Sequence, residues 1–140
     1  MAVNFSHIHR AFPYVATCGT EVQVWSAGIT DMLQVFWMDV VRACILFKAI
    51  DHLNGHLKDG LKLGDFSSIN PGSLPDWPIT EQPKLFSMLG GVKAAIGVTL
   101  TESMLMLPSK SVSGIYFQAE TSFENLHILS NFHIYISINI

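Results

Sequence analysis

Charged residues are scarce in this chain of 140 residues. Aspartate, glutamate, lysine and arginine make up 14% of it, and 8 basic side chains stand against 11 acidic ones, which gives a net charge of -3. Proteins that hold nucleic acid through its phosphates carry an excess of basic residues, so this balance excludes a general electrostatic grip on nucleic acid. With 49% hydrophobic residues and a mean hydropathy of +0.36, we expect an apolar surface patch that a partner covers.

Long apolar runs and cysteines are also lacking. The stretch Met1–Arg10 has no apolar run of signal-peptide length, and the most apolar window, Val40–Ile50, is interrupted by charged residues. Cys18 and Cys44 are too few for a disulfide framework or for a zinc site built from four ligands of this kind. We therefore expect a cytoplasmic protein with no membrane segment and two buried, free thiols.

The length predicts a single domain, and its first element is expected to be a strand. Residues Ile8–Cys18 are rich in aromatic and β-branched side chains, and Pro13 indicates that this strand lies at a sheet edge or carries a bulge. Thr20 and Gln23 have the spacing of a capping box, which predicts a helix with Thr20 as its N-cap.

The helical region that begins there is expected to be interrupted near Gly28 and to end near Leu57. Between Met32 and Ile50, apolar residues cover nearly the whole circumference of the helix. A helix with almost no polar face is normally covered on several sides, so we expect a long central helix.

The segment Ser67–Pro78 is expected to be a long ordered loop, because it combines prolines and small polar residues with apolar anchors. Thr80 is predicted to cap a short helix that runs to Leu89 and is closed by Gly90 and Gly91. A further helical turn is predicted to end at Gly97, since glycine commonly closes helices.

From Val98 onward the apolar residues alternate with polar ones. This pattern predicts a strand over Val98–Leu107, a turn at Pro108–Lys110 and a strand over Ser111–Gln118, paired as an antiparallel hairpin. From His133 onward isoleucines alternate with polar residues, which predicts a half-buried strand. The expected fold is α+β: an antiparallel sheet with a long central helix and short helices.

The residues that commonly bind metals or act as nucleophiles lack suitable partners in this sequence. His52 and His56 have the spacing that places two imidazoles on one helix face, but no third ligand is near, so we expect two solvated histidines. His7 and His9 share a strand face without a complementary carboxylate. No histidine is placed to activate Cys18, so burial is the better interpretation of that thiol.

The loop and the hairpin described above remain as candidates for binding. Both are rich in hydroxyl side chains and glycine, which suits a polar small molecule held by backbone groups and framed by Trp77, Tyr116 and Phe117. Glu102, inside an apolar strand, either faces solvent or binds a polar group of the ligand. The residues alone therefore indicate an α+β ligand-binding or interaction domain.

The stretch Leu100–Phe117, LTESMLMLPSKSVSGIYF, resembles the activation (reactivation) domain of cobalamin-dependent methionine synthase. That family has an LTES strand, an apolar strand, a proline turn and an S-V-S-G motif followed by aromatic residues. The loop Asn70–Gln82, NPGSLPDWPITEQ, is similar to the Pro-Gly-Tyr loop of the family, and Phe12–Ser26 is similar to small stand-alone members.

The resemblance implies a cofactor site. The activation domain binds S-adenosylmethionine in a shallow groove and docks over cobalamin held by a partner module, where it permits reductive remethylation of inactive cob(II)alamin. No catalytic side chain or metal ligand is implied, because the corrinoid carries the chemistry. The implied cofactor-binding residues are Pro71, Gly72, Ser73, Glu102, Ser113, Gly114 and Tyr116.

Several positions depart from the family pattern. Ser68 stands where the family has an arginine able to pair with the methionine carboxylate, and Ser73 follows the loop glycine where the family has tyrosine. Leu46 or Phe47 aligns with the ligand-binding glutamate of the family.

Two functions therefore stay open. In the first, the chain assists S-adenosylmethionine-dependent reductive methylation of a corrinoid held by a partner protein, as at most one component of a cobalamin-dependent methyltransferase system. In the second, it is a non-catalytic module of the same fold that docks on the corrinoid protein without S-adenosylmethionine. In both functions cobalamin is bound by the partner protein and not by this chain. The low net charge argues against a nucleic-acid role, and the lack of a long apolar run argues against a membrane role. Whether the chain forms a homodimer stays open.

We expect one activation-domain-like unit over residues 1–140, truncated at its N-terminus, because family members carry a substantial segment before the first strand. Residues 125–140 form an atypical isoleucine-rich tail. The sequence has no D-x-H-x-x-G motif for ligating cobalamin, so it is not a whole methionine synthase.

Overall fold

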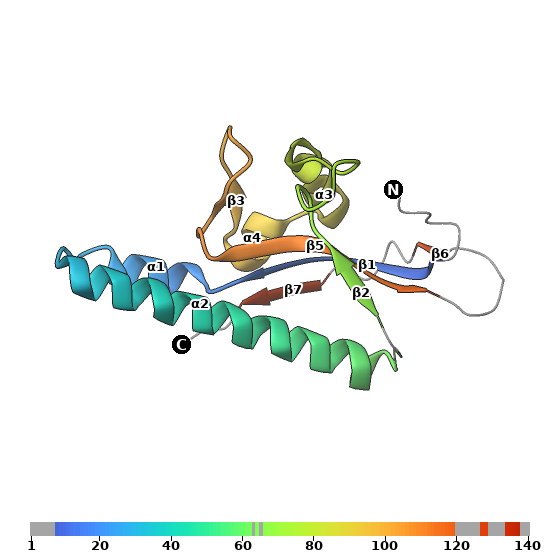
Figure 1. The fold of residues 1–140 in the computed structure, drawn as a ribbon, viewed down its shortest axis with the longest axis horizontal. Coiled ribbons are helices and arrows are strands. Elements are labelled where there is room, and N and C mark those ends of the chain that lie inside the picture. The colour runs from blue at the N-terminus through green and yellow to red at the C-terminus, as the bar shows by residue number, and fades with distance from the viewer. Residues whose placement is uncertain (1–7, 63, 65, 120–126, 129–133, 138–140) are drawn as a thin grey trace.

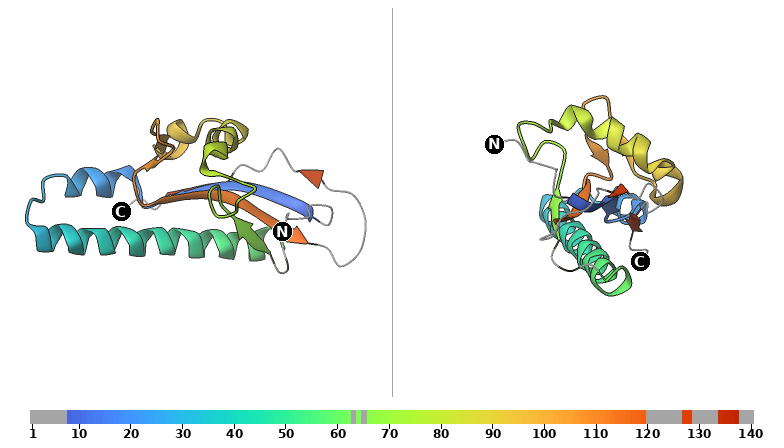
Figure 2. Two further views of the ribbon diagram at one scale, coloured as in Figure 1. Left: turned by 45° about the horizontal axis from the view of Figure 1, so that its top comes forward. Right: turned by 90° about the vertical axis from the view of Figure 1, so that its right-hand side faces the viewer.

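The computed structural model describes residues 8–62, 64, 66–119, 127–128 and 134–137, arranged in three layers. A sheet lies in the middle, and the long helix α2 (Met32–Gly55) runs along one of its faces (Figure 1). The short helices α3 (Gln82–Leu89) and α4 (Val92–Ile96) lie on the opposite face, as the end-on view in Figure 2 shows. This arrangement confirms the predicted α+β class.

Three antiparallel strands form the main part of the sheet. They are β1 (Ile8–Thr17), β5 (Ser111–Ala119) and the short β2 (Ser67–Ile69), in the order β2-β5-β1. On the other edge of β1, β6 (His127–Ile128) and β7 (Ile134–Ser137) pair with it in parallel. The isoleucine-rich strand of the tail thus has a neighbour, which the sequence pattern did not identify.

Of the two predictions made from Pro13, the edge strand is wrong, because β1 has partners on both sides, while the bulge or irregularity in β1 lies between Ile8 and Arg10 and not at the proline. Pro13 pairs with Ile115 of β5 on one side. On the other side, the pairing with β6 ends at Ala11 and that with β7 begins at Tyr14. The proline therefore lies between the described pairings of β1 with β6 and with β7.

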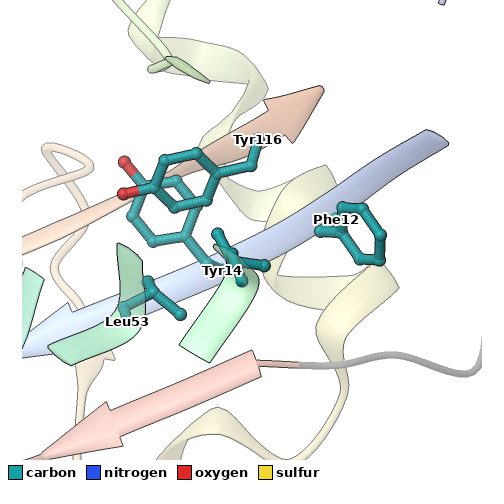
Figure 3. Packing of buried hydrophobic residues seen from close by; sticks show 5 residues of the cluster. Phe12, Tyr14, Leu53 and Tyr116 are labelled. Carbon is teal, nitrogen blue, oxygen red and sulfur yellow. The ribbon is translucent and has the colours of Figure 1, made fainter. Parts of the chain in front are cut away.

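The two faces of the sheet have separate apolar cores, as the alternation along β1 requires. Toward α2, the core contains Phe12, Tyr14, Leu53, Leu57 and Tyr116, shown in Figure 3. Toward α3 and α4, it contains Val15, Leu85, Leu89, Val92 and Val98.

The helix α1 (Thr20–Ser26) starts without the predicted capping box. Its N-cap is Gly19, whose φ of 92° few other residues tolerate, and no side chain caps the helix. Thr20 is the first helical residue, and its side chain packs against Gly97 instead. The predicted capping box is wrong because Gly19 takes the N-cap position that the prediction gave to Thr20, and the sequence alone does not show this.

The predicted interruption of the helical region near Gly28 is confirmed. The first helix ends at Ser26, and α2 begins after Asp31, whose carboxylate accepts a hydrogen bond from the Gln34 N–H at 2.9 Å. After Gly55 a single π turn, η2 (His56–Gly60), continues the helix. Along the ranges that the structure describes, no helix combines the length and hydropathy of a membrane span.

The prediction that α2 is covered on several sides is wrong for the described structure. Within α2 only Met38, Ala49 and Leu53 are buried, although most of its residues are apolar. The C-terminal half lies against the sheet, and the N-terminal half extends beyond β1 alongside α1 (Figure 1). One layer covers one side of a helix, so the outer side of α2 stays exposed, Cys44 included, which corrects the prediction of two buried thiols.

The expected loop after the helix is shorter than predicted, because its first residues form β2. The chain then turns through residues 70–78. Within this turn, Leu74 and Trp77 form an isolated antiparallel β-bridge. Thr80 lies inside a 3-10 turn, η3 (Ile79–Glu81), and does not cap α3, while Gly90 and Gly97 do end α3 and α4 as predicted.

The predicted hairpin between residues 98–107 and 111–118 is wrong. The first segment folds on itself, with β3 (Thr99–Leu100) paired to β4 (Met106–Leu107). The turn between them is closed by Thr101, whose hydroxyl accepts from the Leu105 N–H at 3.1 Å. The second segment, β5, pairs with β1 instead, because β1 is the longer apolar partner.

Leu53 and Leu105 offer a matched test of this packing. Leu53 is fully buried under the sheet, whereas Leu105 is 64% exposed in the β3–β4 turn. We expect Leu53→Ala to lower the free energy of unfolding by about 2–5 kcal/mol, and Leu105→Ala by less than about 0.5 kcal/mol. Urea denaturation measures both, and equal losses would contradict the placement of α2 on the sheet.

Candidate functional site

The turn that follows β2 is closed by its own polar groups. The Gly72 N–H donates to the Trp77 carbonyl at 2.7 Å, and the Ser73 hydroxyl donates to the Asn70 carbonyl at 2.5 Å. Gly72 has a φ of +87°, a conformation that favours glycine. Gly72 and Ser73 are exposed and Pro71 is buried. The turn therefore presents backbone to solvent while hydrogen bonds within it hold its shape.

Asn70 ties this turn to the centre of the sheet. Its side-chain amide donates to the Tyr14 hydroxyl at 3.1 Å and to the Ser113 carbonyl at 2.7 Å. Next to it, β2 and β5 approach closely: a Cβ on Gly114 would lie 2.4 Å from the Ile69 carbonyl oxygen and 2.9 Å from the Asn70 amide nitrogen. Glycine is needed at 114 for this close approach.

Tyr14 and Tyr116 form a stacked pair beneath α2. Their ring centroids are 4.4 Å apart (Figure 3). Phe66 packs edge-on against Tyr116, with ring centroids 5.3 Å apart. The two tyrosines are 3% and 4% exposed. Burial raises the pKa of both phenols, and the neighbouring Tyr14 raises that of Tyr116 further. Both hydroxyls are thus uncharged at neutral pH.

The structure brings most of the predicted site residues to one region but buries several of them. Ser113 is 2% exposed, and Tyr116 belongs to the core toward α2. The predicted frame of Trp77, Tyr116 and Phe117 does not form, because Trp77 packs in the core on the other face of the sheet. Phe117 follows Tyr116 in the strand and so points away from it.

Glu102 is separated from the other predicted residues. It lies exposed in the turn between β3 and β4, not inside a strand as predicted. Figure 1 shows this hairpin and the turn after β2 as separate projections from the sheet. Of its two predicted roles, the solvent-facing one agrees with this position.

The fit to S-adenosylmethionine can be tested on the charged groups of that ligand. Its carboxylate needs a cation, yet Ser68 stands in β2 opposite Tyr116, and the sequence has no lysine or arginine from Gly64 to Gln82. On α2, Phe47 is 66% exposed and offers no charge for the ligand's amino group. The described residues fit a backbone contact at Gly72 but not the charged end of S-adenosylmethionine.

The histidines and Cys18 give little support for metal binding or nucleophilic catalysis. His52 and His56 are exposed, as expected for solvated histidines, and among the described residues no group of three His, Cys, Asp or Glu side chains is placed to hold a metal ion. Burial raises the pKa of the Cys18 thiol, which suits an inert side chain. The side chains of His7 and His9 lie outside the described residues.

Tyr14 and Asn70 are the residues that sequence reasoning missed. Together they connect the turn, β1 and β5 through one side-chain amide. The available signal was an asparagine directly before Pro-Gly, a position where this side chain often bonds to nearby backbone.

The comparisons with known proteins agree with the resemblance over part of the chain. Residues 64–127 match the family described as vitamin B12 dependent methionine synthase, activation domain. The matched segment includes the Asn70 turn, the LTES segment and β5, and it begins after α2. No curated protein matches the chain.

Two glycines test the close approach of β2 and β5. Gly114→Ala is expected to destabilise the fold by more than about 3 kcal/mol, because the added carbon would lie 2.4 Å from the Ile69 carbonyl oxygen, a backbone atom that cannot move aside as the end of a flexible side chain can. Gly55→Ala, at the end of α2 with nothing within 4 Å, is expected to stabilise it by about 0.5–1 kcal/mol. Thermal melts measure both, and the same sign for the two variants would contradict this geometry.

The stacked tyrosines predict loss of stability at alkaline pH. The folded chain raises both phenol pKa values above the ordinary 10.0, so their contribution is complete below pH 10 and is lost as the pH rises above it. The measurement uses the double variant Cys18→Ala, Tyr135→Phe, which removes the thiol whose pKa is also raised and leaves Tyr14 and Tyr116 as the tyrosines of the sequence. In this variant we expect phenolate absorbance to appear together with loss of the folded circular-dichroism signal. Titration near pH 10 in a chain that stays folded would contradict the burial of the pair.

Proposed function

We propose that this chain docks on a cobalamin-binding protein and assists reactivation of the corrinoid that the partner holds. The basis of the proposal is the match of residues 64–127 to the activation-domain family. The observation that carries this proposal is the exposed Gly72 turn, held against β5 by Asn70 inside the matched segment. A rigid turn that presents backbone can dock without a large loss of conformational entropy.

The proposal has two forms, which differ in the methyl donor. In the first, the chain binds S-adenosylmethionine at the turn and supports reductive methylation of the corrinoid, with the exposed Gly72 and Ser73 in contact with the ligand. In the second, the chain docks without S-adenosylmethionine. Ser68 and the burial of Tyr116 favour the second form, because they remove a cation and an accessible aromatic side chain from the site.

The contribution of the chain's own residues is positional in both forms. Asn70 fixes the turn on the sheet, and Gly72 permits a close approach to its backbone. Cobalamin, bound by the partner, supplies the methyl-transfer and redox chemistry. No side chain of this chain is assigned a proton-transfer step.

Binding to a cobalamin-loaded partner tests the proposal itself. The probe is the cobalamin-binding module of a B12-dependent methionine synthase, titrated with the purified chain in the absence and presence of S-adenosylmethionine. We expect saturable binding by calorimetry and a change in the corrinoid absorption spectrum. Absence of binding under both conditions, with a chain that melts cooperatively, would refute the proposed function.

A substitution at Ser68 separates the two forms. Ser68→Arg restores the family's cation, and under the second form it is expected to improve S-adenosylmethionine binding by about tenfold or more over a wild-type chain that binds weakly. Ser67→Arg is the matched control, because the neighbouring side chain of a strand points to the opposite face. Micromolar binding by the wild-type chain that Ser68→Arg leaves unchanged would instead establish the first form.

A further inference from the structure

The outward side of α2 carries a row of apolar side chains that the described residues leave exposed. Leu33, Trp37, Val40, Cys44 and Phe47 follow one another in steps of four and three residues, and we call them the outer seam. Leu33 is 63% exposed, Trp37 58% and Phe47 66%. Alternating steps of four and three give the 3.5-residue period of helices that pair lengthwise.

The outer seam is well separated from the side of α2 that packs on the sheet. With 3.6 residues per turn, its residues lie on the side of the helix opposite to the buried Met38, Ala49 and Leu53. Packing against the sheet therefore leaves the seam free, and a partner can reach it without disturbing either core.

Charge does not interrupt the seam. The charged residues between Met32 and Phe47 are Asp39 and Arg42. The Asp39 carboxylate pairs with the Lys110 ammonium at 2.9 Å, and Arg42 donates to the Ser26 hydroxyl, so both are engaged within the chain. A surface complementary to this face is itself apolar and uncharged, which an identical seam satisfies.

The size of the face matches that of a stable interface. Met32, Phe36 and Val41, which flank the seam, are 88%, 61% and 43% exposed. Together with the seam they offer on the order of 800 Å², given that a large side chain presents about 150–250 Å². A standard interface buries about 800 Å² on each partner, so the area of this face reaches that of a standard dimer interface.

A hollow next to the seam provides a place for an anchoring side chain. It lies between α1 and α2 and has a volume of about 390 Å³. Its lining is apolar apart from one carboxylate and consists of Glu21, Val22, Trp25, Val41 and Ile45. Aromatic side chains that fill such hollows commonly dominate the binding energy of an interface.

We propose that two copies of this chain form a dimer through the outer seams of their α2 helices. The interface is isologous, with each copy presenting the same residues. It does not involve the Gly72 turn, so it is independent of the proposed docking on a cobalamin-binding protein.

Sedimentation velocity of the purified chain tests the dimer. We expect a discrete species of twice 15.5 kDa at micromolar concentration. The double variant Val40→Glu, Phe47→Glu is expected to raise the dissociation constant by about 100-fold or more, because the two-fold axis places each carboxylate in the interface twice. Met88→Glu is the control, since Met88 is a 50% exposed apolar residue on α3.

Cys44 gives a second measurement that needs no destabilising change. It lies in the seam with an exposed thiol, whereas Cys18 is buried, so a short bismaleimide is expected to link two wild-type chains and to fail with Cys44→Ser. A wild-type monomer up to about 100 μM, a dimer that survives the double variant, or only large aggregates would each overturn the proposal.

Discussion

The enclosure of β1 on both faces and both edges is the constraint on which the rest of the structure depends. Every residue from Phe12 to Cys18 is buried. The strand β5 pairs along one edge and β6 and β7 along the other, while α2 covers one face and α3 and α4 the other. The short strands and helices cannot bury their apolar sides alone, and α2 rests its buried residues on the sheet, so β1 supplies the apolar surface on which these elements pack.

Local chemistry accounts for the features that were predictable from the sequence. The first strand, the break near Gly28, the helix ends at Gly90 and Gly97 and the α+β class all follow from short-range patterns. The partners of the strands were not predictable in this way, because alternation shows that a segment is a strand but not which strand it joins. The hairpin was therefore assigned to neighbours in sequence, although β5 pairs with β1 about a hundred residues earlier in the chain.

The same enclosure explains why the candidate site was only partly predictable. The sequence motif suggests that Tyr116 is an accessible aromatic residue. However, its strand lies between two layers of helices, and the alternation of side chains along the strand places Tyr116 in the core beside Tyr14. Ser113 is buried for the same reason. The turn after β2 and the β3–β4 turn project from the layers, so Gly72 and Ser73 in the first and Glu102 in the second are the predicted residues that a ligand or partner can reach directly.

The apolar residues around α2 suggest a helix buried inside the domain, but burial within this chain does not account for all of them. A helix that is apolar all round is expected in the middle of a domain, yet α2 lies on the outside of the sheet. Burial on the sheet explains Leu53 and its neighbours, whereas the 3.5-residue spacing on the outer side fits the second apolar surface that the proposed dimer supplies. Since α2 and the Gly72 turn lie on opposite sides of the sheet, occupation of the seam leaves the turn accessible (Figure 2).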